Sequence, residues 1–209
     1  MSTAALQRVW VDAGLASREI LAAFREAGSV ATLKALQRRK GPAYSMASFN
    51  TGGMLQLMGG VRALFKSLYT TEIDKQFKAA INDFTGVKCL GDTFTQDYSK
   101  LHSVVLASIT TECPDYASGS TNVRLNLKHG CDGDKGGWQF MLSVQPVLQL
   151  RPLIIEYEMV ANALEVHDGA EVIFVASTYK KANYQVLAAK VTMQQYGDIV
   201  NKHRFMMVS

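Results

Sequence analysis

Residues 129–137 hold the densest group of side chains in the sequence that can bind a metal or transfer a proton. Asp132 and Asp134 match the opening of a calcium-binding loop. Such a loop also needs an oxygen ligand two residues further on and a glutamate at its twelfth position, where this chain has Gly136 and Ser143. The spacing therefore does not predict a calcium site.

His129 and Cys131 are residue types that bind zinc, but a tetrahedral site needs two more ligands. Cys113 and His102 have no spacing that would support them as those ligands. Glycine and aspartate between two strands are also what a hairpin turn requires. We interpret the segment as a turn and predict no metal site. Convergence of His129, Cys131, Asp132 and Asp134 within hydrogen-bonding reach would instead indicate an enzyme with an unrecognised site.

Patterns typical of catalysis and of phosphate binding are missing from the sequence. There is no Gly-x-Ser-x-Gly, no Gly-x-x-x-x-Gly-Lys-Ser/Thr and no Gly-x-Gly-x-x-Gly. Glu156 and Glu158 lie on one face of an expected strand, where cross-strand ion pairs explain them more simply than a paired-carboxylate site. The basic candidates for those pairs are Arg124, Lys128 and Lys190. We therefore predict that the protein is not an enzyme, with no catalytic residue and no cofactor.

Composition places the chain among ordinary globular proteins. Its 209 residues are enough for one sizeable core, with 48% apolar and 19% charged residues. No apolar run approaches the ~18 residues of a membrane-spanning helix, so we predict no transmembrane segment. Three cysteines, an odd number without a C-x-x-C motif, favour a reducing intracellular setting. The interior of an organelle, without a cleaved presequence, is the alternative.

Residues 138–160 dominate the prediction of secondary structure. Apolar side chains from Trp138 to Val144 alternate with polar ones or Met141, and the alternation resumes after Pro152. A period of two is typical of half-buried strands. Strands are expected at residues 103–109, 122–128, 138–145, 153–160, 171–178, 184–193 and 203–208.

Before residue 103 the apolar residues follow a helical period instead. From Met54 to Leu68 they recur at i, i+3, i+4 and i+7, and a second helix is expected from Ile73 to Phe84. Strands that follow helices, without alternation of the two, indicate the α+β class. The predicted fold is N-terminal helices followed by a mostly antiparallel sheet of about six to seven strands.

The first 48 residues are predicted to be a basic helical arm or small helical appendage. Their short apolar stripes are interrupted by glycines, and residues 42–53 have the composition of a linker. Residues 49–209 are predicted to be an α+β domain of two helices and then the antiparallel sheet. The net charge of +4 comes from the arm, which holds seven basic and three acidic side chains. The basic ones are Arg8, Arg18, Arg25, Lys34, Arg38, Arg39 and Lys40.

These observations lead to three functional hypotheses. The first is a non-enzymatic structural or interaction subunit that docks on other protein subunits through the basic arm, in a homo- or hetero-oligomer. The second is a module that binds a small molecule or lipid in an apolar pocket between helices 54–84 and the sheet. That pocket would be lined by Trp138, Phe140, Leu142, Tyr157, Phe174 and Phe205. The third uses the arm to hold an acidic surface, such as nucleic acid or anionic lipid.

Overall fold

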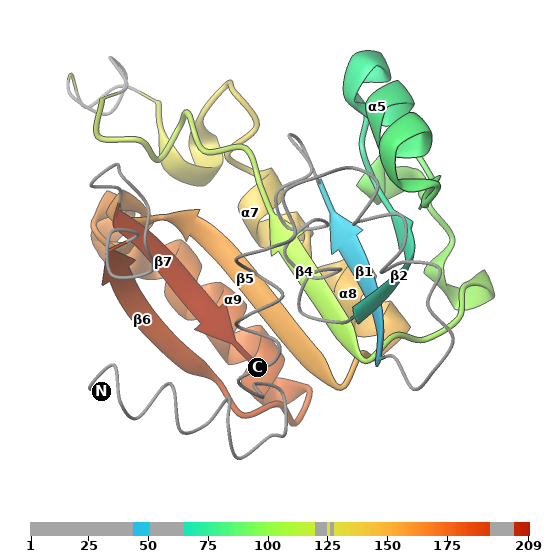
Figure 1. The fold of residues 1–209 in the computed structure, drawn as a ribbon. Helices are drawn as coiled ribbons and strands as arrows, with labels where there is room; N and C mark the ends of the chain where they lie inside the picture. The colour runs from blue at the N-terminus through green and yellow to red at the C-terminus, as the bar shows by residue number, and fades with distance from the viewer. Residues whose placement is uncertain (1–43, 51–64, 120–124, 126–127, 193–202) are drawn as a thin grey trace. The chain divides into compact units, whose positions relative to one another are not determined.

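The computed structural model describes residues 44–50, 65–119, 125, 128–192 and 203–209, and Figure 1 shows their helices and strands. All seven basic residues of the predicted arm lie outside the described residues, so the arm stays a prediction. Most of the strand expected at 122–128 also lies outside them. The chain divides into two compact units, residues 1–91 and 92–209.

In the first unit, three parallel strands pair in the order β3-β2-β1. The elements are β1 (Tyr44–Phe49), β2 (Phe65–Thr70), α5 (Lys75–Thr85) and β3 (Lys88–Cys89). The helix α5 starts after Asp74, whose side chain accepts hydrogen bonds from the N–H groups of Gln76 and Phe77. It stops at Gly86, which takes a left-handed conformation with φ +69°.

In the second unit, four strands pair in the order β4-β5-β7-β6. The strands and α-helices are β4 (Leu106–Thr110), α7 (Gln139–Leu142), α8 (Val144–Leu150), β5 (Ile154–Val160), α9 (Ala170–Lys181), β6 (Leu187–Thr192) and β7 (His203–Val208). The strands β4 and β5 are parallel, and β7 is antiparallel to both β5 and β6. The helices α7, α8 and α9 lie on one face of these strands (Figure 1).

The core of the second unit forms where these helices meet the sheet. Phe140, Val144 and Val147 recur at i, i+4 and i+7, and each is at most 1% exposed. The Phe140 ring packs edge-on against the Tyr157 ring of β5, with centroids 5.2 Å apart. On α9, Tyr179 is fully buried. A helical stripe, and not a pleated face, therefore covers β5.

The prediction of a mostly antiparallel α+β fold is wrong. Of the five strand pairings described within the two units, three are parallel and two are antiparallel. The error comes from two segments that were expected to be strands: 138–145 lies mostly in α7 and α8, and 171–178 lies in α9. With those segments helical, α7 and α8 form the crossover that parallel β4 and β5 require.

In both misinterpreted segments the apolar residues fit the period of a strand as well as that of a helix. Pro146 does not break α8, because it is the third residue of the helix, where an N–H would have no helical acceptor. Residues 171–176 suggested a strand covered on both sides because apolar residues face both ways. In the structure, Ile173 and Phe174 are 63% and 48% exposed, while Val172 and Val175 are buried. Exposed apolar residues on a helix imitated a central strand.

Other predictions were better founded. The strands β4, β5, β6 and β7 confirm those expected at 103–109, 153–160, 184–193 and 203–208, with shifted ends. The helix expected from Met54 is described only from Phe65 onward, where the chain forms β2, and β1 occupies half of the expected linker. In the described part of the chain, no helix combines the length and apolarity needed to cross a bilayer.

Candidate active site

The loop that follows β4 presents a thiol. Cys113 lies three residues beyond the end of the strand and is half-buried. Its carbonyl oxygen accepts hydrogen bonds from the N–H groups of Tyr116 and Ala117, at 3.0 and 2.9 Å. This turn ends the extended backbone and fixes the position of Cys113 at the carboxyl end of a parallel strand, where ligands of such sheets bind.

A buried carboxylate holds the loop in place. Asp115 is fully buried, and its Oδ2 accepts hydrogen bonds from the N–H groups of Lys135 and Gly137, at 2.8 and 3.0 Å. Its carbonyl oxygen accepts another from Gly130 at 2.9 Å. The glycine-rich segment 130–137 is therefore wrapped around Asp115, and this packing explains its glycines better than a hairpin turn does.

We expect Gly137→Ala to destabilise this packing. A Cβ at position 137 would lie 1.9 Å from the Gly130 carbonyl oxygen and 3.0 Å from the Asp115 Cβ. Because the closer neighbour is backbone, the loop must shift, and the free energy of unfolding should fall by about 1–3 kcal/mol in urea denaturation. Gly119→Ala is the control, since its Cβ would meet nothing within 4 Å. Equal stability of the two variants would contradict the packing described.

An ion pair on the neighbouring strands acts on the thiol. The Arg204 Nε of β7 lies 2.6 Å from the Glu158 Oε1 of β5. Burial raises the pKa of Cys113, the negative charge of Glu158 raises it further, and the positive charge of Arg204 lowers it. The register of β4 and β5 pairs Thr110 with Glu158, just before the loop that carries Cys113. Thiol, carboxyl group and guanidinium therefore belong to one electrostatic site.

The pKa of the Glu158 carboxyl group is also shifted upward. Burial raises the pKa of Glu158, the charge and hydrogen bond of Arg204 oppose the rise, and the charge of Glu156 adds to it, with a net upward shift. Glu156 itself has a pKa raised by burial, and its Oε2 accepts a hydrogen bond from Ser108 at 2.8 Å. A carboxyl group with a raised pKa beside a thiol is the pairing that nucleophilic and general acid catalysis need.

The residues singled out from the sequence are divided between two places. Cys131 lies near His167 and Glu171, away from the Asp134 carboxylate, which is 3.9 Å from Lys128 Nζ on the surface. Cys131 Sγ also lies 3.9 Å from Asp132 Oδ1, and the His129 ring centroid lies 4.8 Å from that of His167. His129, Cys131 and Asp132 therefore come together at one place, and Asp134 pairs with Lys128 instead. The expected ion pairing of Glu158 is confirmed in kind, but its partner is Arg204 and none of the expected basic residues.

The six residues expected to line an apolar pocket do not share one environment. Phe140, Tyr157 and Phe205 are at most 1% exposed and belong to the core. Trp138, Leu142 and Phe174 are between 43% and 50% exposed. The first three fill the space between the helices and β5, as close packing of an interior requires.

Solved structures with a similar fold are methyltransferases. A prophage-encoded protein of E. coli, described as a DNA modification methyltransferase, aligns with a TM-score of 0.59 and 16% identity over 79% of this chain and 46% of that chain. The S. pombe Dnmt2 methyltransferase aligns with a TM-score of 0.52 and 12% identity over 80% of this chain and 49% of that chain. The chain shares the fold of these two proteins. It spans about half the length of these two proteins.

A third solved structure, precorrin-6y C5,15-methyltransferase from Geobacter metallireducens, aligns with a TM-score of 0.47 and 13% identity over 86% of each chain. No family model and no curated protein sequence matches the chain. The methyltransferase fold contradicts our prediction of a non-enzymatic structural or interaction subunit, because the solved structures that share it are enzymes. The prediction that the protein is not an enzyme is corrected on the same ground.

Sequence reasoning missed Cys113 and Arg204 as members of an active site. Cys113 entered only as a distant zinc ligand, because β4 was not recognised as a parallel strand with a functional carboxyl end. The signal that could have found it is its place three residues after an apolar strand. Arg204 had no such signal, since only the pairing of β7 with β5 brings it to Glu158.

Proposed function

We propose that the protein is a methyltransferase that methylates C5 of cytosine in nucleic acid through a covalent adduct on the Cys113 thiol. One observation carries the proposal: at the carboxyl end of β4 in a methyltransferase fold, a half-buried thiol feels the charges of both Glu158 and Arg204. The likeness of fold supports methyl transfer as the reaction class, and the thiol supports a carbon atom as the methyl acceptor.

A nucleophilic thiol favours carbon as the methyl acceptor. Nitrogen and oxygen acceptors have lone pairs that attack a methyl donor directly, so they need a base but no covalent partner. C5 of a pyrimidine has no such lone pair and becomes nucleophilic only after a nucleophile adds to the neighbouring C6. A thiolate is a strong nucleophile for this type of addition, and because the pKa of Cys113 is raised, its thiol must first lose a proton to a base.

The three side chains supply complementary parts of this chemistry. Cys113, after losing its proton, adds through Sγ to C6, and the electron pair of the C5–C6 double bond becomes available at C5. Glu158 in its protonated form gives a proton to ring N3 and removes the charge that develops there. Arg204 holds the Glu158 carboxyl group in place. Once C5 carries the methyl group, a base removes the C5 proton, the electron pair of that C–H bond re-forms the C5–C6 double bond as the S–C6 bond breaks and frees the thiolate, and N3 returns its proton to Glu158.

The Glu158 carboxyl group also selects between the two pyrimidine nucleobases. Cytosine N3 accepts a hydrogen bond, whereas uracil N3 carries a hydrogen and donates one. The Glu158 carboxyl group in its protonated form can donate a hydrogen bond to cytosine N3 but finds no acceptor at uracil N3. We therefore assign cytosine, and not uracil, as the substrate base.

The fold implies S-adenosylmethionine as the methyl donor, and the carboxyl ends of β1 and β2 fit such a group. Ligands of parallel sheets bind outside these ends, where an acidic residue often holds ribose hydroxyls. Glu72, two residues beyond β2, is only 8% exposed, and its Oε1 accepts the Asp74 N–H at 2.9 Å. Asn50, just beyond β1, donates its N–H to Thr71 Oγ1 at 3.1 Å. When bound, S-adenosylmethionine supplies an electrophilic methyl group, and we assign Asn50, Thr71 and Glu72 to its binding.

Nucleic acid as the carrier of the base is supported by charge and by likeness. The net charge is +4, and residues 1–48 hold seven basic and three acidic side chains, a balance that favours phosphate. One similar structure is described as acting in DNA modification. A nucleophilic thiol must also stay reduced, so we place the protein in an intracellular compartment.

The proposal predicts where a labelled methyl group ends up. The full chain should transfer label from S-adenosylmethionine to cytosine-containing duplex DNA, and nucleoside analysis by mass spectrometry should find 5-methylcytosine. The same DNA with C5 already methylated should accept no label. Label on a ring or exocyclic nitrogen, or none from a chain shown by equilibrium dialysis to bind the donor, would overturn the assignment.

A further inference from the structure

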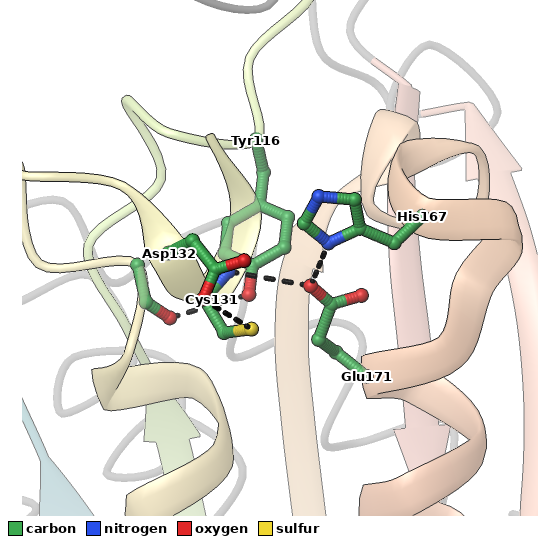
Figure 2. A network of polar contacts seen from close by, with 6 residues as sticks. Tyr116, Cys131, Asp132, His167 and Glu171 are labelled. Carbon is green, nitrogen blue, oxygen red and sulfur yellow. Dashed lines mark hydrogen bonds and ion pairs between the residues drawn. The ribbon is translucent and has the colours of Figure 1, made fainter. Parts of the chain in front are cut away.

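A second cluster of reactive side chains lies beside the loop that carries Cys113 (Figure 2). Cys131 comes from the short helix η3 (Gly130–Asp132), His167 from the turn η5 (Val166–Gly169), and Glu171 from the first turn of α9. Their ligand atoms, one thiol, one imidazole nitrogen and one carboxylate oxygen, all lie within 4.8 Å of one another. Ligand atoms around one zinc ion are about 3–4 Å apart, given bond lengths of ~2.0–2.3 Å. Small side-chain movements would therefore bring the three ligand atoms to the distances found around a zinc ion.

The contact with His167 accounts for only one of the two carboxylate oxygens of Glu171. The residue is 3% exposed. Its Oε1 lies 2.6 Å from His167 Nδ1 and accepts the Cys131 N–H at 3.2 Å, as Figure 2 shows in part. Its other oxygen, Oε2, is buried and has no hydrogen-bond partner among the described residues. Leaving a buried carboxylate oxygen without a partner costs free energy.

The pKa values of Glu171 and Cys131 are shifted in opposite directions. Burial by itself would raise the pKa of Glu171, but hydrogen bonds from the His167 ring and from Cys131 lower it overall. The carboxyl group is therefore a carboxylate at neutral pH. The pKa of the Cys131 thiol, in contrast, is raised to about 11, first by burial and then by Glu171. A metal ion would reverse that shift, because a coordinating thiol loses its proton.

The backbone brings these side chains together at some cost. His167 and Asp168 have φ of +47° and +54°, and Gly169 continues the left-handed turn with φ +72°. Left-handed conformations are unfavourable for residues with a side chain and tend to persist where function requires them. Across the cluster, a Cβ on Gly130 would lie 2.7 Å from Glu171 Oε1. Only glycine at that position lets η3 approach the start of α9 so closely.

We propose that Cys131, His167 and Glu171 bind a zinc ion. A thiolate, an imidazole and a carboxylate together match the borderline character of zinc and differ from the all-oxygen sets that calcium and magnesium prefer. Three protein ligands leave a fourth position to water. The ion links η3 to the start of α9, and η3 is in turn joined to the Cys113 loop by the Gly130 N–H on the Asp115 carbonyl oxygen. The site thus supports the loop and is separate from the proposed methyl transfer.

Cobalt substitution on the full chain tests the site. After treatment with a chelator, Co²⁺ should bind at one equivalent per chain, with tetrahedral d–d bands and a near-ultraviolet thiolate-to-cobalt band, and Zn²⁺ should displace it. Cys131→Ser should abolish the charge-transfer band, and His167→Gln should weaken zinc binding by more than about 100-fold in competition with a chromophoric chelator. Cys89→Ser and Cys113→Ser are matched controls and should keep the band.

The two test positions are partly exposed, so both variants should fold, and thermal unfolding checks that they do. Zinc should raise the unfolding temperature of the wild type and leave that of Cys131→Ser unchanged. A chain that binds no cobalt would overturn the proposal. So would a band that survives in Cys131→Ser or disappears in Cys113→Ser, and so would zinc affinity unchanged in His167→Gln. In each case the His167–Glu171 pair would be an ion pair and nothing more.

Discussion

Serine in place of Cys113 is expected to lower the rate of methyl transfer at least about 10³-fold and to leave the chain folded. A hydroxyl group is far less acidic than a thiol and adds poorly to C6 of a pyrimidine. The fold should survive because the hydrogen bonds of the loop use the carbonyl oxygen of residue 113, and not its side chain. The measurement is the initial rate of label transfer to cytosine in duplex DNA, together with thermal unfolding of both proteins.

DNA that contains 5-fluorocytosine provides a second readout of the same prediction. Fluorine replaces the proton that must leave C5, so the adduct on the nucleophile should persist and be found by mass spectrometry on the Cys113 peptide. Cys113→Ser should form no adduct. Cys89→Ser is the matched control, because serine can keep the contact that the Cys89 thiol makes with the Glu72 carbonyl oxygen. An adduct on another cysteine, or near-normal transfer by Cys113→Ser, would rule out the proposed nucleophile.

The sequence predicted strands well where one side of the strand is polar. In β5, buried Ile155, Tyr157 and Met159 alternate with Glu156 and Glu158, and that pattern is unambiguous. The prediction from sequence failed for α9, which is apolar on both sides because Ile173 and Phe174 are exposed. Misreading two crossover helices as strands removed the alternation of strand and helix that indicates a parallel sheet.

The candidate site was less predictable than the fold because its members are distant in the sequence. Glu158 was expected to form a cross-strand ion pair, but the identity of its partner depends on the antiparallel pairing of β5 with β7. Cys113 stands alone in sequence, 45 positions before Glu158, and only the parallel register of β4 and β5 relates the two. Pairing between strands is a tertiary property that periodicity along one strand does not encode.

Glutamine in place of Glu158 is expected to change catalysis and thiol reactivity in opposite directions. The rate of methyl transfer should fall about 10²–10⁴-fold, because an amide cannot give up a proton to cytosine N3 as a carboxylic acid does. The pKa of Cys113 should fall at the same time, since the negative charge of Glu158 that raises it is lost and the positive charge of Arg204 that lowers it remains. At a pH below that pKa, a lower pKa means more thiolate, so iodoacetamide should alkylate Cys113 faster.

The two rates separate a proton donor from a residue that only tunes the thiol. Both are measured at pH 8, alkylation by mass spectrometry of the Cys113 peptide and methyl transfer by label incorporation. Glu165→Gln is the control, because Glu165 is exposed and its carboxylate lies 3.8 Å from Lys190 Nζ; neither rate should change there. If Glu158 acted only by suppressing thiolate formation, its removal would speed up both reactions. If Glu158 only held the loop in place, its substitution would change both rates for a reason other than the pKa of Cys113. Faster alkylation with slower methyl transfer is the combination that requires Glu158 to act on the pyrimidine itself.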